Sequence, residues 1–176
     1  MYFNSLHMSM TNQTFQHAEK LAGHYFRLSP DKMKSYRYDV KTLAYLEDHE
    51  VKSGAFAHLC KYHYKKEKEE KASDLDSFHF YRICLQDNRI LDAVERGHSF
   101  VKLTPLMLYI AAHELVHIIR FDNGEIGFDA PLKEKELEEE KVHAITRDML
   151  QASINSDLKI VIDCFSNRYK IGDFCN

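Results

Sequence analysis

The strongest hydrophobic signal in the chain lies between about residues 105 and 121. Apolar side chains leave almost no polar face there, which is typical of a helix buried on all sides. These side chains are Leu106, Met107, Leu108, Ile110, Leu115, Val116, Ile118 and Ile119. A turn signal, Asp122-Asn123-Gly124, follows this segment, and Pro131 is typical of a helix start. The next helix is predicted over about residues 133–152, with an apolar stripe of Val142, Ile145, Met149 and Ala152.

Weaker patterns predict the remaining elements. A first helix is expected from Asn12 to Leu28, and Ser29-Pro30-Asp31 predicts the start of a long helical stretch towards Lys71. Aromatic and branched residues from Phe78 to Leu85 favour a strand, and residues 88–95 favour a short helix. Leu158 to Phe165 fits either a second strand or a buried terminal helix.

Together these elements predict an α+β fold that is predominantly helical, with a small sheet. A chain of 176 residues with 44% hydrophobic residues can bury one core, so we expect a single domain over residues 1–176. Within it we expect a helical part over about residues 1–75, a central part over 76–152 and a C-terminal segment over 153–176. No repeat or clear linker divides the sequence.

Composition and the absence of certain motifs limit the classes of partner and the cell compartment that fit this chain. A formal charge of -3 argues against a dedicated nucleic-acid binder. Four scattered cysteines, none in a C-x-x-C pair, indicate reduced thiols. Residues 1–10 lack a charged leader and an apolar core, and no stretch reaches the roughly 18 uninterrupted apolar residues of a membrane span. These observations predict a cytoplasmic protein that does not insert into membranes.

The predicted buried helix contains the sequence His113-Glu114-Leu115-Val116-His117. Residues four apart share one helix face, so both histidines can bind one ion, and Glu114 can serve as a base for a water activated by that ion. A carboxylate buried without a partner costs several kcal/mol, on the order of a lost ion pair, which favours a functional role over an incidental one. The motif predicts a zinc site with one Zn²⁺ per chain.

A catalytic zinc site needs a third protein ligand and leaves its fourth position to water. The second helix offers Glu138 near the middle of its apolar stripe and Glu139 on the flank, while Glu140 points away. Periodicity alone does not choose between Glu138 and Glu139. Most charges of this acidic run are also compatible with an ordinary solvated helix start.

The H-E-x-x-H motif followed by Glu139-Glu140-Lys141-Val142-His143 resembles the gluzincin pattern of zinc peptidases over about residues 105–150. The resemblance implies that residues 76–152 form a zincin-like catalytic core, with Glu139 as the third ligand. It places His143 where that family carries an Asp or Asn beside a zinc-binding histidine, and Val142 where it usually carries Ala. It also implies that the strand before the motif helix, Phe78 to Leu85, is a candidate edge strand for pairing with an extended peptide; an ordinary core strand is the alternative.

These residues predict a zinc-dependent peptidase acting on a peptide or protein, with Glu114 as general base. His143, Tyr109 and Tyr169 are candidates for stabilising the oxyanion, and spacing selects none of them. One alternative is a metal-binding domain for regulation or interaction, without hydrolysis. A second is a di-iron carboxylate bundle, because Glu114 to His117 and Glu140 to His143 both read E-x-x-H; the short, broken segment between them disfavours it.

Overall fold

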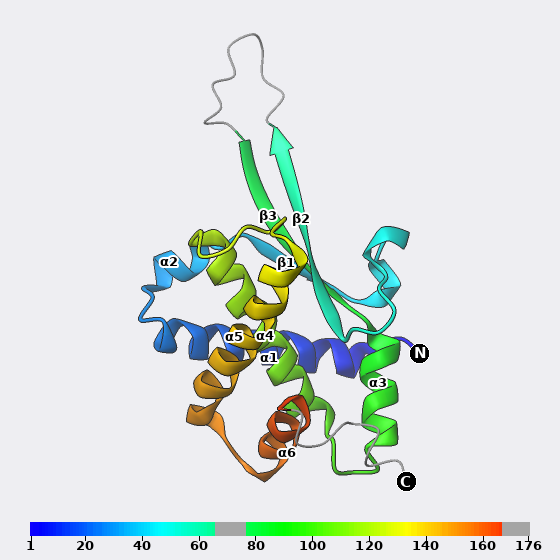
Figure 1. The fold of residues 1–176 in the computed structure, drawn as a ribbon. Coiled ribbons are helices and arrows are strands. Elements are labelled where there is room, and N and C mark those ends of the chain that lie inside the picture. Colours follow the sequence, from blue (N-terminus) through cyan, green and yellow to red (C-terminus); the bar gives the residue numbers. More distant parts are fainter. Residues whose placement is uncertain (66–76, 167–176) are drawn as a thin grey trace.

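The computed structural model describes residues 1–65 and 77–166 and has an α+β fold (Figure 1). The helices are α1 (Ser5–Tyr25), α2 (Pro30–Ser35), α3 (Asp87–Arg96), α4 (Leu103–Asp122), α5 (Leu132–Leu150) and α6 (Ser156–Phe165). The strands are β1 (Tyr38–Lys41), β2 (Ala57–Lys65) and β3 (Ser77–Leu85). None of the helices in these two ranges combines the length and apolar content needed to cross a bilayer. The predicted α+β class with a small sheet is confirmed.

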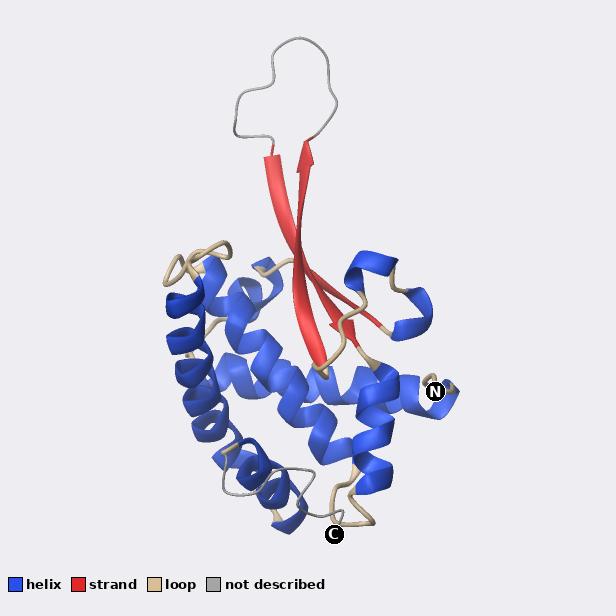
Figure 2. Ribbon diagram, turned by 45° about the vertical axis from the view of Figure 1, so that its right-hand side comes forward, coloured by secondary structure: helices blue, strands red, loops and turns tan. Residues whose placement is uncertain are grey.

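Helix α4 lies at the centre of the molecule. Leu106, Leu115, Ile118 and Ile119 are fully buried, as the apolar pattern of this segment requires. Helices α1, α3, α5 and α6 and strand β2 all pack against α4, and α5 runs along one side of it (Figure 2). Contacts with four helices and one strand therefore fix the position of α4, and this packing does not involve a ligand.

The three strands form a sheet in the order β1-β3-β2. Strand β1 pairs with β3 in parallel, whereas β2 and β3 form a long antiparallel pair with Leu59 opposite Ile83. The prediction that Phe78 to Leu85 is an edge strand is wrong, because both neighbouring positions are filled by chain from the first 65 residues. Within the described chain, β2 is an edge strand on the side that faces α4 and α5.

The prediction of a long helix from Ser29 to Lys71 is also wrong, and so is a wholly helical N-terminal part. Helix α2 ends at Ser35, and β1, two single-turn 3-10 helices and β2 follow before residue 66. The residues of β1 and β2 make their hydrogen bonds to β3, so long-range pairing overrides the local helical tendency. Residues 66–71 lie outside the described part of the chain.

The other helix predictions are correct in type but differ at the ends. Helix α1 begins at Ser5, seven residues before the predicted Asn12, because the side chain of Asn4 accepts a hydrogen bond from the backbone of His7. Helix α5 agrees with the prediction over 133–152 to within two residues, and α3 agrees with 88–95. Leu158 to Phe165 is a helix, capped by the side chain of Asn155.

Candidate metal centre

Helix α4 directs His113, Glu114 and His117 into the interior between α5 and β2. Both imidazoles are mostly buried, with side chains only 12% and 10% exposed, and Glu114 is buried as well. The i and i+4 spacing brings the two histidines to the same face of the helix, where their rings meet edge to face. The arrangement expected from the sequence is therefore present on α4.

The donor atoms of three side chains form a nearly equilateral triangle. The Nε2 atoms of His113 and His117 lie 3.2 Å apart, and Oε2 of Glu139 lies 3.2 Å from the first and 3.3 Å from the second. A tetrahedral zinc with bonds of about 2.0–2.1 Å separates neighbouring ligand atoms by about 3.3–3.4 Å. The triangle thus has the size of one face of a zinc tetrahedron, and the donor types suit that ion.

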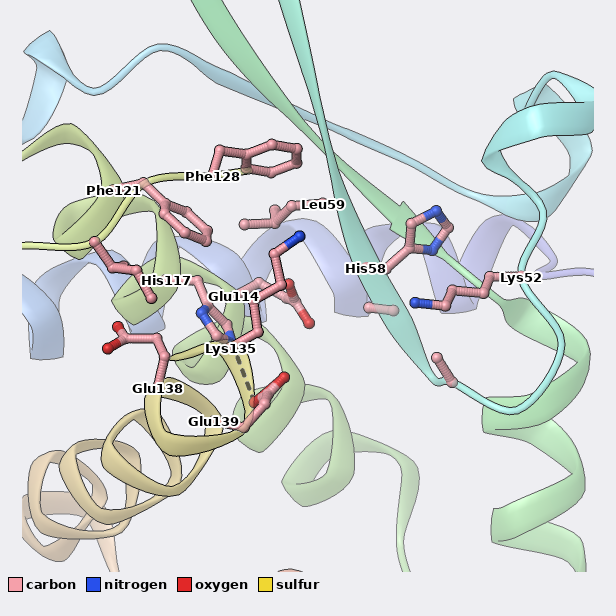
Figure 3. A pocket seen from close by; sticks show the side chains of 13 residues that line it. Lys52, His58, Leu59, Glu114, His117, Phe121, Phe128, Lys135, Glu138 and Glu139 are labelled. Atoms are coloured by element: carbon pink, nitrogen blue, oxygen red, sulfur yellow. Dashed lines mark hydrogen bonds and ion pairs between the residues drawn. The ribbon is translucent and has the colours of Figure 1, made fainter. Parts of the chain in front are cut away.

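The structure separates Glu139 from Glu138, which the sequence could not do. Glu138 is buried and pairs with Arg120 of α4, whose Nε lies 2.5 Å from Oε1 and whose Nη2 lies 3.0 Å from Oε2. The same guanidinium also binds Glu125. In Figure 3 the carboxylate of Glu138 points away from that of Glu139. Glu138 is committed to this ion pair, and Glu139 is the acidic side chain that reaches the histidines.

The two carboxylates of the site have opposite protonation tendencies. Burial is the main influence on Glu114 and raises its pKa to about 7, while the nearby His117 and Lys52 act to lower that pKa. Burial alone would raise the pKa of Glu139 too. Hydrogen bonds to His113 and His117 outweigh it and hold the pKa of Glu139 well below its usual range. The site thus combines the carboxyl group of Glu114, which can gain or lose a proton near neutral pH, with the carboxylate of Glu139, which stays negatively charged.

Glu114 stands between two cavities of about 260 and 270 Å³. Ala55 and Ala57 also line both of them, so the two cavities adjoin at Glu114, and together they are called the cleft here. The end beside His117 is walled by Leu59 of β2 and by Phe121 and Phe128, as Figure 3 shows. His113, Glu114, His117 and Glu139 therefore border space that a ligand can occupy.

His143 closes the other end of the cleft. Its Nδ1 lies 2.7 Å from the hydroxyl oxygen of Tyr109, and its ring lies beside that of His113 with centroids 4.5 Å apart. Donor atoms of His113, Glu139 and His143 fall within 4.8 Å of one another. Burial, with help from the charge of His113, lowers the pKa of His143 to about 4, so this imidazole is neutral at pH 7. Tyr169, another candidate oxyanion donor, lies outside the described residues.

The residues of the di-iron alternative do not come together. Glu140 is exposed on the outer face of α5, whereas such a bundle needs that carboxylate inside. His113, for which that scheme has no role, instead provides one corner of the triangle. We conclude that the E-x-x-H repeat is not the organising feature of the site.

Comparisons with known proteins add no family assignment to this geometry. The chain matches no family model, curated protein or solved structure. The likeness to gluzincins therefore rests on the residues of the motif and of α5 themselves.

Two contributions to the site were not predicted from the sequence. Lys52, Ala55 and Ala57 line the cleft but lie in a stretch that had been predicted as helix. Arg120 orients α5 through Glu138, and it follows the second histidine by only three residues. The sequence signal for this ion pair is an arginine in a helix predicted to be buried, because a buried charge of this kind requires an acidic partner.

Proposed function

We propose that the protein is a zinc-dependent peptidase that holds one Zn²⁺ by His113, His117 and Glu139. The observation that carries this proposal is the triangle of donor atoms with edges of 3.2 to 3.3 Å. Three protein ligands leave the fourth position of a tetrahedral ion open, which is the pattern of catalytic rather than structural zinc. The open cleft along the triangle supports the same reading.

Glu114 is the general base of the proposed reaction. Zinc in such a site would activate a water and polarise the scissile carbonyl. The buried carboxylate of Glu114 accepts a proton from the attacking water and then donates it to the leaving amine. Burial keeps the proton affinity of Glu114 high enough for both transfers near neutral pH. His143, oriented through its Nδ1 by Tyr109, is the side chain best placed to donate to the developing oxyanion.

The substrate we propose is an extended peptide. Strand β2 pairs with β3 along one edge, and its first residues, Ala57 to Leu59, line the cleft beside Glu114. An exposed strand edge binds an extended chain through main-chain hydrogen bonds. The edge-pairing role that was expected for Phe78 to Leu85 is thereby assigned to β2.

A second candidate function is metal binding without hydrolysis. The observation in its favour is the proximity of His143 to His113 and Glu139, within 4.8 Å. If His143 supplied a fourth ligand, all positions of a tetrahedral ion would be filled by protein and no water could be activated. Replacing His143 separates the candidates: a true ligand lowers zinc affinity strongly, whereas an oxyanion donor lowers turnover and leaves zinc bound.

The decisive experiment compares wild type with Glu114→Gln, His117→Ala and the exposed control Glu140→Gln. Zinc is measured by elemental analysis, and hydrolysis by mass spectrometry of a diverse peptide pool. We expect Glu114→Gln to keep one zinc at the site and lose cleavage, His117→Ala to lose both, and Glu140→Gln to match wild type. A zinc content of His117→Ala equal to that of wild type, or undiminished cleavage by Glu114→Gln, would refute the proposal.

A further inference from the structure

A second group of metal-binding side chains lies on the opposite face of the sheet from α4. His58 and Cys60 alternate along β2 and so point to the same side, and the antiparallel register places Cys84 of β3 directly opposite His58. Leu59, between the two, points to the other side of β2, towards Phe121 and Phe128 (Figure 3). The side chains of His58 and Leu59 thus leave β2 on opposite sides, and the residue His58 also borders the cavity beside His117.

The distances within the group match those of a thiolate metal site. The Sγ atoms of Cys60 and Cys84 lie 3.8 Å apart, and Sγ of Cys60 lies 3.7 Å from Nε2 of His58. All three donor atoms fall within 4.8 Å of one another. A tetrahedral ion with zinc–sulfur bonds of about 2.3 Å places two sulfurs about 3.8 Å apart, and a sulfur and a nitrogen about 3.6 Å apart.

The surroundings also fit a bound cation. Cys84 is completely buried, and Nδ1 of His58 is buried with no hydrogen-bond partner within the described residues. Burial raises the pKa of both thiols, so without a cation they stay protonated and uncharged near neutral pH. A dication would offset two thiolate charges in this partly apolar environment.

We propose that His58, Cys60 and Cys84 form a second metal site, selective for a thiophilic cation such as Zn²⁺ and independent of the His113 triangle. Binding releases the two thiol protons to solvent, and the ion is held by two thiolates and Nε2 of His58. The nearby Glu50 is not a fourth ligand, because its carboxylate is bound by Tyr62 and Arg82. The fourth position is left to water or to an external ligand.

Cobalt(II) distinguishes the two sites in one experiment, because only thiolate ligands give a near-ultraviolet charge-transfer band with this ion. The full-length reduced chain is stripped of metal and titrated with Co²⁺, and bound zinc is counted in parallel after Zn²⁺ addition. The variants are His58→Ala, Cys60→Ala, Cys84→Ala and His117→Ala. Cys164→Ala is the matched control, since Cys164 lies on α6 and outside the group.

We expect the charge-transfer band in wild type, His117→Ala and Cys164→Ala, and its loss in Cys60→Ala and Cys84→Ala. His58→Ala should weaken cobalt binding at this site by at least about 10-fold while keeping a thiolate band. Loss of the band in His117→Ala alone would overturn the assignment, as would a wild-type chain with no band. Failure of the His113 site would appear differently, as an unchanged band with no zinc lost in His117→Ala.

Two controls keep the result interpretable. Circular dichroism and thermal unfolding confirm that each variant is folded, and His58→Ala tests the site without altering the buried thiol of Cys84. In the chain purified without reductant, a Cys60 to Cys84 disulfide appears as an intact mass lower by two hydrogens, and this loss is absent in Cys60→Ala and Cys84→Ala. Formation of that disulfide in place of metal uptake by the reduced chain would also overturn the proposal.

Discussion

Glu138, Glu139 and Glu140 are consecutive on α5, yet the structure predicts a different result for the replacement of each by Ala. Glu138→Ala removes both hydrogen bonds to the buried guanidinium of Arg120 and leaves that charge with Glu125 as its acidic partner. Breaking a buried ion pair by removing one partner costs about 3–5 kcal/mol. Because Glu125 still compensates Arg120 in part, we expect a loss of about 3 kcal/mol in the free energy of unfolding.

Glu139→Ala should behave in the opposite way. The side chain of Glu139 is 52% exposed, so its contacts with the histidines of the metal-free protein contribute at most about 1 kcal/mol to stability. As a proposed ligand, however, it should lower zinc affinity by more than about 100-fold when removed. Glu140 is exposed and contacts neither group, so Glu140→Ala should change stability by no more than about 0.5 kcal/mol and leave zinc binding intact.

Urea unfolding of the metal-free variants gives the stabilities, and competition with a zinc-binding dye gives the affinities. The reasoning fails if Glu138→Ala loses zinc affinity while remaining as stable as wild type, since Glu138 would then be the ligand. It also fails if Glu139→Ala retains wild-type affinity. Parallel losses in all three variants would indicate disruption of α5 as a whole and contradict the distinct roles.

Two further predictions concern stability at acid pH and the orientation of His143. Burial would raise the pKa of Glu50, but hydrogen bonds with Tyr62 and Arg82 lower it to about 2, below its ordinary value of 4.5. Glu50 thus contributes stability that is fully present above about pH 4.5 and is lost as the pH falls towards 2. We expect Glu50→Gln to unfold about 2–3 kcal/mol more easily at pH 7, with the difference shrinking towards pH 3 in denaturant titrations. An equal loss at both pH values would contradict this account. Tyr109→Phe removes the hydroxyl beside Nδ1 of His143, and we expect kcat to fall at least about 10-fold with zinc content unchanged; loss of zinc instead would favour His143 as a ligand.

The sequence predicted most reliably those elements whose pattern lies within one short segment of the chain. Helix α4 was predictable because apolar residues surround it, and the positions of His113, Glu114 and His117 on it follow from helical periodicity alone. Helix α5 was predictable from its apolar stripe and from Pro131 at its start. What periodicity could not supply was the choice between Glu138 and Glu139, because the choice depends on Arg120 of another helix.

The sheet shows what local sequence patterns could not predict. Strands β1 and β2 are defined by pairing with β3, which follows β2 after an intervening segment and β1 after 35 residues. The local pattern over residues 29–65 does not reveal this long-range pairing, so the segment was predicted to be helical. The group of His58, Cys60 and Cys84 was missed for the same reason. Its one local signal is the His-x-Cys spacing, which places two donors on one face only if the segment is a strand.

The ion pair between Arg120 and Glu138 has a consequence for how the chain can tolerate length changes. Successive residues of a helix are about 100° apart, so anchoring Glu138 to α4 fixes the direction in which Glu139 projects. One residue inserted between them would rotate Glu139 away from His113 and His117. Insertions in the exposed segment near Gly127, before α5 begins, leave that rotation unchanged, because the anchor lies inside the helix. The direction of Glu139 therefore depends on the register of α5 itself and not on the length of the loop before it.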